Sequence, residues 1–289
     1  GHPERIARIE AVNKALAGDS WSALIRHEAP RATKDQLVRV HDSRYVDLVL
    51  NNIPEDGFTR LDADTVMSPF TGDAALHAAG AIIAAVDTVA SGEADNAFCA
   101  IRPPGHHAEP GNGMGFCFFN NVAIGALHAR IVHGLERVAI VDFDVHHGNG
   151  TQAAFKSDAN TLFASSHQYP YYPGTGAAEE TGVGNIFNAP LEAGDGGPEF
   201  RQALEDYILP AVRLFRPNIV FISAGFDAHV LDPLASLRLE EEDFEWATAE
   251  LKKVAQEFAC GRLVSTLEGG YDLEALGNSV QAHVSALMT

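Results

Sequence analysis

The chain has 289 residues, 46% of them hydrophobic, and a net charge of −19 from 20 basic and 39 acidic side chains. Phosphate contacts require clustered Lys and Arg, so this balance argues against direct binding to nucleic acid. No run approaches about 18 consecutive apolar residues, which predicts a soluble, cytoplasmic protein without a membrane partner. The cysteines Cys99, Cys117 and Cys260 lie in separate apolar runs and are expected to be buried free thiols.

Apolar segments alternate along the chain in a way that predicts strands and helices in turn. Strands are expected near 97–101, 138–143, 161–165, 219–223 and 263–267. Helices are expected near 72–90, 120–132, 199–215, 241–259 and 273–287. This alternation predicts an α/β fold with a mostly parallel sheet that is covered on both faces. No linker or repeat divides the sequence, so we expect one domain over residues 1–289.

The segment 142–150, Asp-Phe-Asp-Val-His-His-Gly-Asn-Gly, places acids and imidazoles just after a predicted buried strand. Side chains alternate between the faces of a strand, so Asp142, Asp144 and His146 are expected to share one side. An apolar sheet core does not accommodate these groups unless a positive charge lies among them. The sequence therefore predicts a metal site where this strand ends.

An Asp and a His after a strand could equally form a hydrogen-bonded cap and turn. Three further segments favour the metal site, because each places polar groups just beyond a predicted strand. Ligands of open α/β sheets bind beyond the carboxyl ends of the strands. The three segments are RPPGHHAE at 102–109, GFDAH at 225–229 and EGGYD at 268–272.

With GFCFFNN at 115–121 and DFDVHHGNGTQ at 142–152, these motifs resemble the zinc-dependent histone deacetylase and acetylpolyamine amidohydrolase superfamily, nearest its class II branch and bacterial amidohydrolases. The resemblance extends from His2-Pro3-Glu4-Arg5 to about Ser279. It implies a three-layer α/β/α sandwich of the arginase and deacetylase type. It also implies that the chain begins within the family's first motif, so residues upstream are expected to be missing.

By this resemblance, one zinc ion per chain is bound by Asp144, His146 and Asp227. Three protein ligands leave a further position for water or substrate, as catalytic zinc sites do. Two carboxylates and one imidazole would also suit iron(II) or cobalt(II). An arginase-like pair of manganese ions would need more carboxylates and histidines than the motifs supply.

The resemblance also assigns the groups that transfer protons. His107 is expected to act as base and later acid, with His106 as electrostatic support. Asp142 is expected behind His106 and Asn149 behind His107, where class I members carry Asp. Tyr271 matches the family's catalytic tyrosine, whose hydroxyl would donate to the oxyanion formed during attack.

Substrate-channel residues follow from the resemblance alone. Phe116 and Tyr172 match two aromatic walls around an alkyl chain, and the Gly115 carbonyl would accept from the substrate amide. Leu234 lies where some polyamine-specific relatives carry Glu, which favours acyl-lysine or a neutral substrate. Asp64 or Asp62 would hold substrate backbone at the rim, although a solvated turn explains them equally well. The substrate-binding residues expected are Asp64, Gly115, Phe116, Tyr172, Leu234 and Gly270.

A potassium ion is implied beside the zinc site, since oxygen ligands suit a hard cation. The inner site is expected to use Asp142, Asp144, His146, Ser165 and Ser166. A second, more distant site is expected near Phe155, Asp158 and Thr161.

The sequence thus predicts a hydrolase that removes acetyl or another acyl group from the ε-amino nitrogen of acyl-lysine in a peptide or protein. An acetylpolyamine or small-molecule amide deacetylase remains the alternative within the same class. An inactive fold that only binds acyl-lysine is the alternative outside it. An acidic surface would attract cationic substrates or only confer solubility, and a homo-oligomer remains open.

Overall fold

The computed structural model describes residues 2–289 and is built around a six-stranded sheet. All strand pairs of this sheet are parallel, and the order is β3-β8-β7-β4-β5-β6. The strands are β3 (Asn96–Cys99), β4 (Val138–Asp142), β5 (Thr161–Gln168), β6 (Ile186–Leu191), β7 (Ile219–Ala224) and β8 (Leu263–Leu267). A separate two-stranded antiparallel sheet pairs β1 (Thr59–Arg60) with β2 (Val66–Met67).

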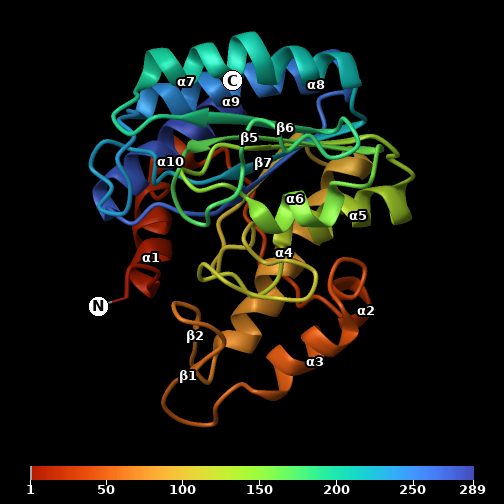
Figure 1. The fold of residues 1–289 in the computed structure, drawn as a ribbon, viewed down its shortest axis with the longest axis vertical. Coiled ribbons are helices and arrows are strands. Elements are labelled where there is room, and N and C mark those ends of the chain that lie inside the picture. The colour runs from red at the N-terminus through yellow and green to blue at the C-terminus, as the bar shows by residue number, and fades with distance from the viewer. Residues whose placement is uncertain (1) are drawn as a thin grey trace.

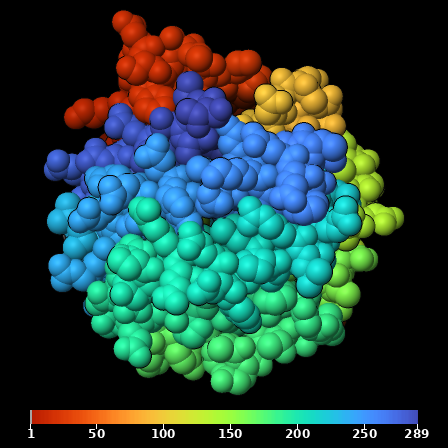
Figure 2. Space-filling model, turned by 90° about the horizontal axis from the view of Figure 1, so that it is seen from above, coloured from red at the N-terminus to blue at the C-terminus, as the bar shows by residue number. Residues whose placement is uncertain are grey.

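Helices cover both faces of the sheet (Figure 1). One layer contains α4 (Thr71–Ser91), α5 (Asn121–His133) and α6 (Asn149–Phe155). The other contains α1 (Ile6–Ala15), α7 (Gly197–Ala203), a short π-helix (Leu204–Ile208, here called the π-turn), α8 (Leu209–Phe215), α9 (Glu241–Phe258) and α10 (Leu273–Met288). Figure 2 shows this second layer from above, in teal and blue, with the N-terminal segment in red beside it. Short elements complete the chain: a 3-10 turn at Asp19–Trp21, α2 (Lys34–Leu37) and α3 (Ser43–Asn51).

Alternation along the buried strands divides the core between the two layers. In β4, Val138 and Ile140 pack in the cluster formed with α4 and α5, whereas Ala139 and Val141 pack in the cluster formed with α9 and α10. All four side chains are at most 1% exposed. The predicted three-layer fold with a parallel sheet is therefore confirmed.

The predicted elements agree with the structure except at the sheet edge and in the N-terminal part of the chain. The expected helix near 199–215 is divided into α7, the π-turn and α8. The sequence did not predict β6, because Pro190 interrupts its apolar pattern. As an edge strand, β6 tolerates a proline that a central strand would exclude. Cys260 corrects another expectation: it is exposed, since it follows α9 in a turn with φ of 53°.

α4 has the length and composition of a membrane-crossing helix, with a mean hydropathy of 1.5 over 18 residues. In the structure its apolar side chains, including Ile82 and Val86, are buried in the core beside α5 and the sheet. Its hydropathy is therefore explained by burial in this layer.

Candidate active site and metal centre

The polar groups expected at the strand ends lie together in the structure. β3, β8, β7 and β4 are adjacent in the sheet, so the loops beyond their carboxyl ends meet along one edge. Asp144, His146 and Asp227 are buried there, and one ligand atom from each lies within 4.8 Å of the other two. This edge is the position that open α/β sheets use for ligands.

Asp144 and His146 are brought together by a turn and not by alternation along a strand. β4 ends at Asp142, so the prediction that Asp142, Asp144 and His146 share one side of a strand is wrong. Beyond the strand, Asp142 Oδ1 accepts the Asp144 N–H at 3.1 Å, and Asp144 Oδ1 accepts the His146 N–H at 2.9 Å. These side-chain-to-backbone bonds fold the loop back on itself.

The three side chains present their ligand atoms to one point. His146 Nδ1 lies 3.1 Å from Asp144 Oδ1 and 3.2 Å from Asp227 Oδ2. Asp227 Oδ1 accepts the Val145 N–H at 3.0 Å, whereas Oδ2 is buried without a hydrogen bond and has only the 3.2 Å ion-pair contact with His146. A buried, unpaired carboxylate oxygen beside an imidazole and a second carboxylate fits a divalent cation.

Two glycines allow these carboxylates to approach each other. A Cβ at Gly225 would lie 2.0 Å from Asp144 Oδ2, and one at Gly269 would lie 2.0 Å from Asp227 Oδ2. Any side chain at either position would displace a carboxylate. Gly269 also donates its N–H to Asp144 Oδ2 at 2.8 Å, which anchors that side chain.

The electrostatics of the cluster favour positive charge. Burial would raise the pKa of Asp144, but His106 and His146 outweigh it and lower that pKa far below its usual range. Burial and the nearby Asp144 together raise the pKa of Asp227. Burial would lower the pKa of His146, but contacts with the two carboxylates raise it to about 10. A cation would therefore stabilise this arrangement of charges.

The tandem histidines have different partners and opposite shifts. His106 Nδ1 lies 2.9 Å from Asp142 Oδ2, and His107 Nδ1 lies 2.8 Å from Asn149 Oδ1. Burial would lower the pKa of His106, but Asp142 and Asp144 outweigh it and raise that pKa well above its ordinary value. Burial, together with the neighbouring imidazoles, lowers the pKa of His107 well below its ordinary value.

Glu268 lies in the EGGYD motif, where no role was predicted for it, and organises the loop before these histidines. Its buried Oε2 accepts the N–H groups of Gly105 at 2.6 Å and His106 at 3.1 Å. Ser223 donates to its other oxygen at 3.3 Å. The carboxylate thus connects the ends of β3, β7 and β8.

Tyr271 is held from both sides by residues that no sequence motif indicated. Asp232 Oδ2 accepts the Tyr271 N–H at 2.7 Å, and the Arg8 guanidinium lies 4.9 Å from the Tyr271 ring centroid. Arg8 is fully buried and donates to the carbonyls of Gly270 at 2.6 Å and Glu268 at 2.5 Å. Burial raises the pKa of Tyr271 well above its ordinary value, so its hydroxyl keeps a proton.

A cavity of about 180 Å³ leads to these groups. Its lining combines His107, His146 and Tyr271 with the expected channel residues Asp64, Gly115, Phe116, Tyr172 and Leu234. Gly270 is not part of this lining, since its carbonyl points to Arg8. Tyr171 lines the cavity without having been predicted: its ring stacks on His146 with centroids 5.7 Å apart, and its hydroxyl donates to the Leu234 carbonyl.

The aromatic wall has an unusual backbone. Gly115 and Phe116 both adopt left-handed conformations, with φ of 56° and 68°. A Cβ at Gly115 would lie 2.4 Å from His107 Cδ2, so only glycine fits. The Gly115 carbonyl accepts from the Cys117 thiol at 3.3 Å, and its N–H donates to Asp64 Oδ1 at 3.1 Å. Asp64 is therefore tied to the wall and is not a freely solvated turn residue.

The expected potassium ligands lie in two places. Asp142 and Ser165 pair in register between β4 and β5, beside the histidine cluster. At the second place, the carbonyls of Phe155, Asp158 and Thr161 converge on the Asn185 side-chain amide at 2.7–3.0 Å. The Asn185 amide thus occupies the oxygens that a potassium ion would need.

Comparison with known proteins agrees with this geometry. The family model described as "Histone deacetylase domain" matches residues 2–287. "Histone deacetylase-like amidohydrolase" of Pseudomonas aeruginosa is 42% identical over 94% of this chain and 73% of its own length. "Histone deacetylase 14, chloroplastic" of Arabidopsis thaliana is 40% identical over 99% of this chain and 73% of its own length.

A solved structure, that of the HDA15 HD domain, matches with a TM-score of 0.93 and 35% identity. The match covers 99% of this chain and 82% of the other. Because sequence and fold agree over almost the whole length, the chain belongs to the histone deacetylase family.

Proposed function

We propose that this deacetylase hydrolyses the ε-acetamide of acyl-lysine with one zinc ion held by Asp144, His146 and Asp227. The observation that carries the proposal is the unpaired, buried Asp227 Oδ2, which faces His146 at the end of an aromatic cavity. Bound zinc lowers the pKa of a coordinated water from 15.7 to about 7 and polarises a carbonyl oxygen. The same ligands would accept iron(II) or cobalt(II).

His107 is suited to be the base that takes a proton from the attacking water. The Asn149 amide nitrogen donates to Glu109 at 2.9 Å, so Asn149 Oδ1 faces His107 and accepts its Nδ1–H. The His107 Nε2 lone pair is then free to accept a proton and later return it to the leaving amine. His106, with Asp142 on its Nδ1, carries the positive charge that supports the developing anion.

Tyr271 supplies the neutral donor for the oxyanion. Its ring lies edge-on to Phe116, with centroids 5.9 Å apart, which places it at the cavity wall. Since its pKa is raised, the hydroxyl donates a hydrogen bond at neutral pH without losing its proton.

The cavity suits an uncharged alkyl chain. Phe116 and Tyr172 form its aromatic walls, and Tyr172 stands edge-on to His107 at 5.2 Å. Leu234 adds an apolar side chain in place of a carboxylate that would attract a polyamine nitrogen. The Gly115 carbonyl keeps a second lone pair for the substrate N–H, and Asp64 lies at the same wall.

Potassium is a further part of the proposal. Asp142 and the β5 residue Ser165 would provide its oxygen ligands beside the zinc site. Such an ion would help to fix the loop after β4.

Metal content and turnover, measured together, test the proposal. Chelation is expected to abolish hydrolysis of an acetyl-lysine fluorogenic peptide, and one equivalent of zinc should restore it. A panel of acetyl-lysine peptides, acetylspermidine and small acetamides should favour the peptides by at least about tenfold, the order expected for mismatched pocket contacts. Faster turnover of acetylspermidine would identify a polyamine, and not acyl-lysine, as the substrate. Binding of acetyl-lysine without turnover would indicate a binding module.

A further inference from the structure

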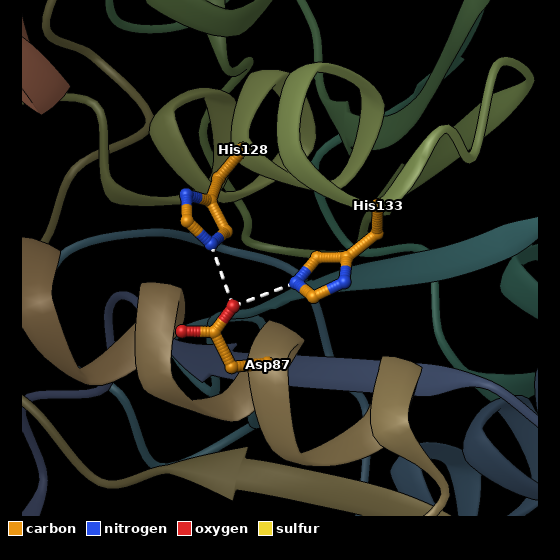
Figure 3. Close-up of side chains that lie close together, drawn as sticks. All are labelled: Asp87, His128 and His133. Carbon is orange, nitrogen blue, oxygen red and sulfur yellow. Dashed lines mark hydrogen bonds and ion pairs between the residues drawn. The ribbon is translucent and has the colours of Figure 1, made fainter.

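A second group of metal-binding side chains lies between α4 and α5. Asp87 comes from α4, and His128 and His133 come from α5; we call these three residues the helix-pair cluster. Asp87 Oδ1 lies 2.7 Å from His128 Nε2 and 2.6 Å from His133 Nε2. Figure 3 shows both contacts meeting at the same carboxylate oxygen.

The helices position the two imidazoles without help from a loop. His133 is the last residue of α5, which ends at Gly134 in a left-handed cap. His128 lies five positions earlier and its side chain is 6% exposed, whereas those of His133 and Asp87 are 24% and 51% exposed. The cluster thus has a buried floor and one side open to solvent.

The three side chains meet at one point as the ligands of a metal centre do, although their 2.6–2.7 Å contacts are those of hydrogen-bonded ion pairs. Among residues 2–289, only two groups of metal-binding side chains bring three ligand atoms within 4.8 Å of one another, and the other is the active site. Two imidazoles and a carboxylate form a set that zinc and similar divalent ions prefer. Burial would raise the pKa of Asp87, but the histidine contacts outweigh it and lower that pKa, which favours the ligating form.

We propose that the helix-pair cluster binds a second divalent transition-metal ion of the zinc type. Asp87 Oδ1 and both Nε2 atoms would be the ligands, and solvent would complete the coordination through the open side. Zinc bonds of about 2.0–2.2 Å in a tetrahedral site place ligand atoms roughly 3.3 Å apart, so the Asp87–histidine contacts would lengthen by roughly 0.6–0.7 Å on binding. Asp87 can provide this movement because half of its side chain is exposed.

Arg39 opposes this binding in the ion-free state. Its guanidinium donates to His128 Nδ1 at 2.9 Å, so the proton of neutral His128 lies on Nε2 and points to Asp87. A metal on Nε2 requires the proton on Nδ1, where it would face a donor. The ion and the Arg39 contact are therefore mutually exclusive.

The position of the cluster separates it from the chemistry. α5 begins at Asn121, whose side chain donates to the Pro103 carbonyl near the tandem histidines. It ends at His133, shortly before β4 begins, and so reaches the amino ends of the strands, away from the active site. A metal there would join α4 to α5 without reaching the substrate.

Zinc counting on the active-site-loaded protein tests the inference. After dialysis against zinc, wild type should hold two ions per chain, and His133→Ala and Asp87→Ala should each hold one. Deacetylase turnover should remain within about twofold of wild type in these variants. His27→Ala, which removes an exposed histidine outside both clusters, should keep two ions.

Arg39→Met provides the opposite change, since it removes the competing donor and keeps an unbranched apolar stem. The second zinc should bind about tenfold more tightly, the scale of effects from partners of metal ligands. Zinc-edge anomalous scattering should place the second ion between Asp87, His128 and His133. A single ion in wild type, unchanged stoichiometry in His133→Ala, or weaker binding in Arg39→Met would each overturn the inference, whereas loss of turnover alone would concern the active site.

Discussion

Tyr271 is fixed by its backbone and by its ring, while its hydroxyl is left to face the cavity. Asp232 accepts its N–H, and Arg8 lies over its ring. Neither contact involves the phenolic oxygen. The phenol can therefore be changed without disturbing the support around it.

Tyr271→Phe should lower kcat about a hundredfold, because one oxyanion donor is lost, and should leave zinc content unchanged. KM should change little, since the ring and its contacts remain. Steady-state kinetics and metal analysis on one preparation check this. Tyr207→Phe, at a partly exposed tyrosine, is the matched control, and equal turnover in both variants would contradict the assigned role.

Sequence motifs predicted the residues that we propose to carry chemistry more readily than the residues that hold them in place. His106, His107 and Tyr271 lie in dense polar motifs after strands, and such positions are informative in α/β folds. Arg8 donates hydrogen bonds to the backbone carbonyls of Glu268 and Gly270, about 260 positions away in the sequence. A contact that uses only carbonyl oxygens imposes no residue type on its partner, so the sequence carries no trace of it.

At the scale of elements, α4 shows how close packing fixes a position that periodicity cannot predict. The Leu76 carbonyl accepts the Ala32 N–H at 2.9 Å, so the segment around Pro30 runs along the helix. A Cβ at Gly80 would lie 1.9 Å from the Pro30 carbonyl oxygen. Small residues predicted a buried helix, but which neighbour approaches Gly80 depends on a segment without regular structure.

Gly80→Ala should destabilise the protein by about 1–3 kcal/mol despite the better helix propensity of alanine, because the clash is with backbone. Gly277→Ala in α10 is the control: its nearest neighbour would be Ala15 Cβ at an ordinary 3.5 Å. That variant should gain roughly 0.5–1 kcal/mol. Chemical denaturation measures both, and equal effects would show that the approach to Pro30 is unimportant.

At the scale of the whole molecule, neutral histidines are built into both helical layers. Burial lowers the pKa of His283 to about 3; its ring lies between the hydroxyls of Thr248 and Ser265. Burial also lowers the pKa of His41 to about 4, and its two nitrogens contact the Glu109 carbonyl and the Asn120 N–H. Unfolding lets both rings take up protons near pH 6.5.

The stability that these two histidines contribute should therefore fall as pH drops below about 6.5, since each ring then binds a proton in the unfolded state but not in the folded state. Each of these histidines should lower the free energy of unfolding at pH 5 by about 2 kcal/mol relative to pH 8. His283→Gln should be less stable at pH 8 but lose less stability between pH 8 and pH 5. Urea unfolding of both proteins at the two pH values checks this. An equal loss of unfolding free energy in wild type and variant would contradict it.

The overall layering was predictable and the strand order was not. Alternating strands and helices imply a covered parallel sheet. The order β3-β8-β7-β4-β5-β6 depends on which helix crosses which face, and β6 lies at an edge where a proline weakens its pattern. The sequence could nevertheless predict that the proposed catalytic groups meet, because every strand order that keeps the four motif-bearing strands adjacent also brings their loops together.

The contact between Gly115 and His107 restricts how this protein can evolve new substrates. Any side chain at Gly115 would displace His107, the proposed base, so we expect this position to stay unchanged wherever activity is kept. The Leu234 side chain carries no such penalty, because Tyr171 bonds only the Leu234 backbone carbonyl. Divergence in substrate choice among descendants should therefore accumulate at Leu234, while Gly115 stays constant.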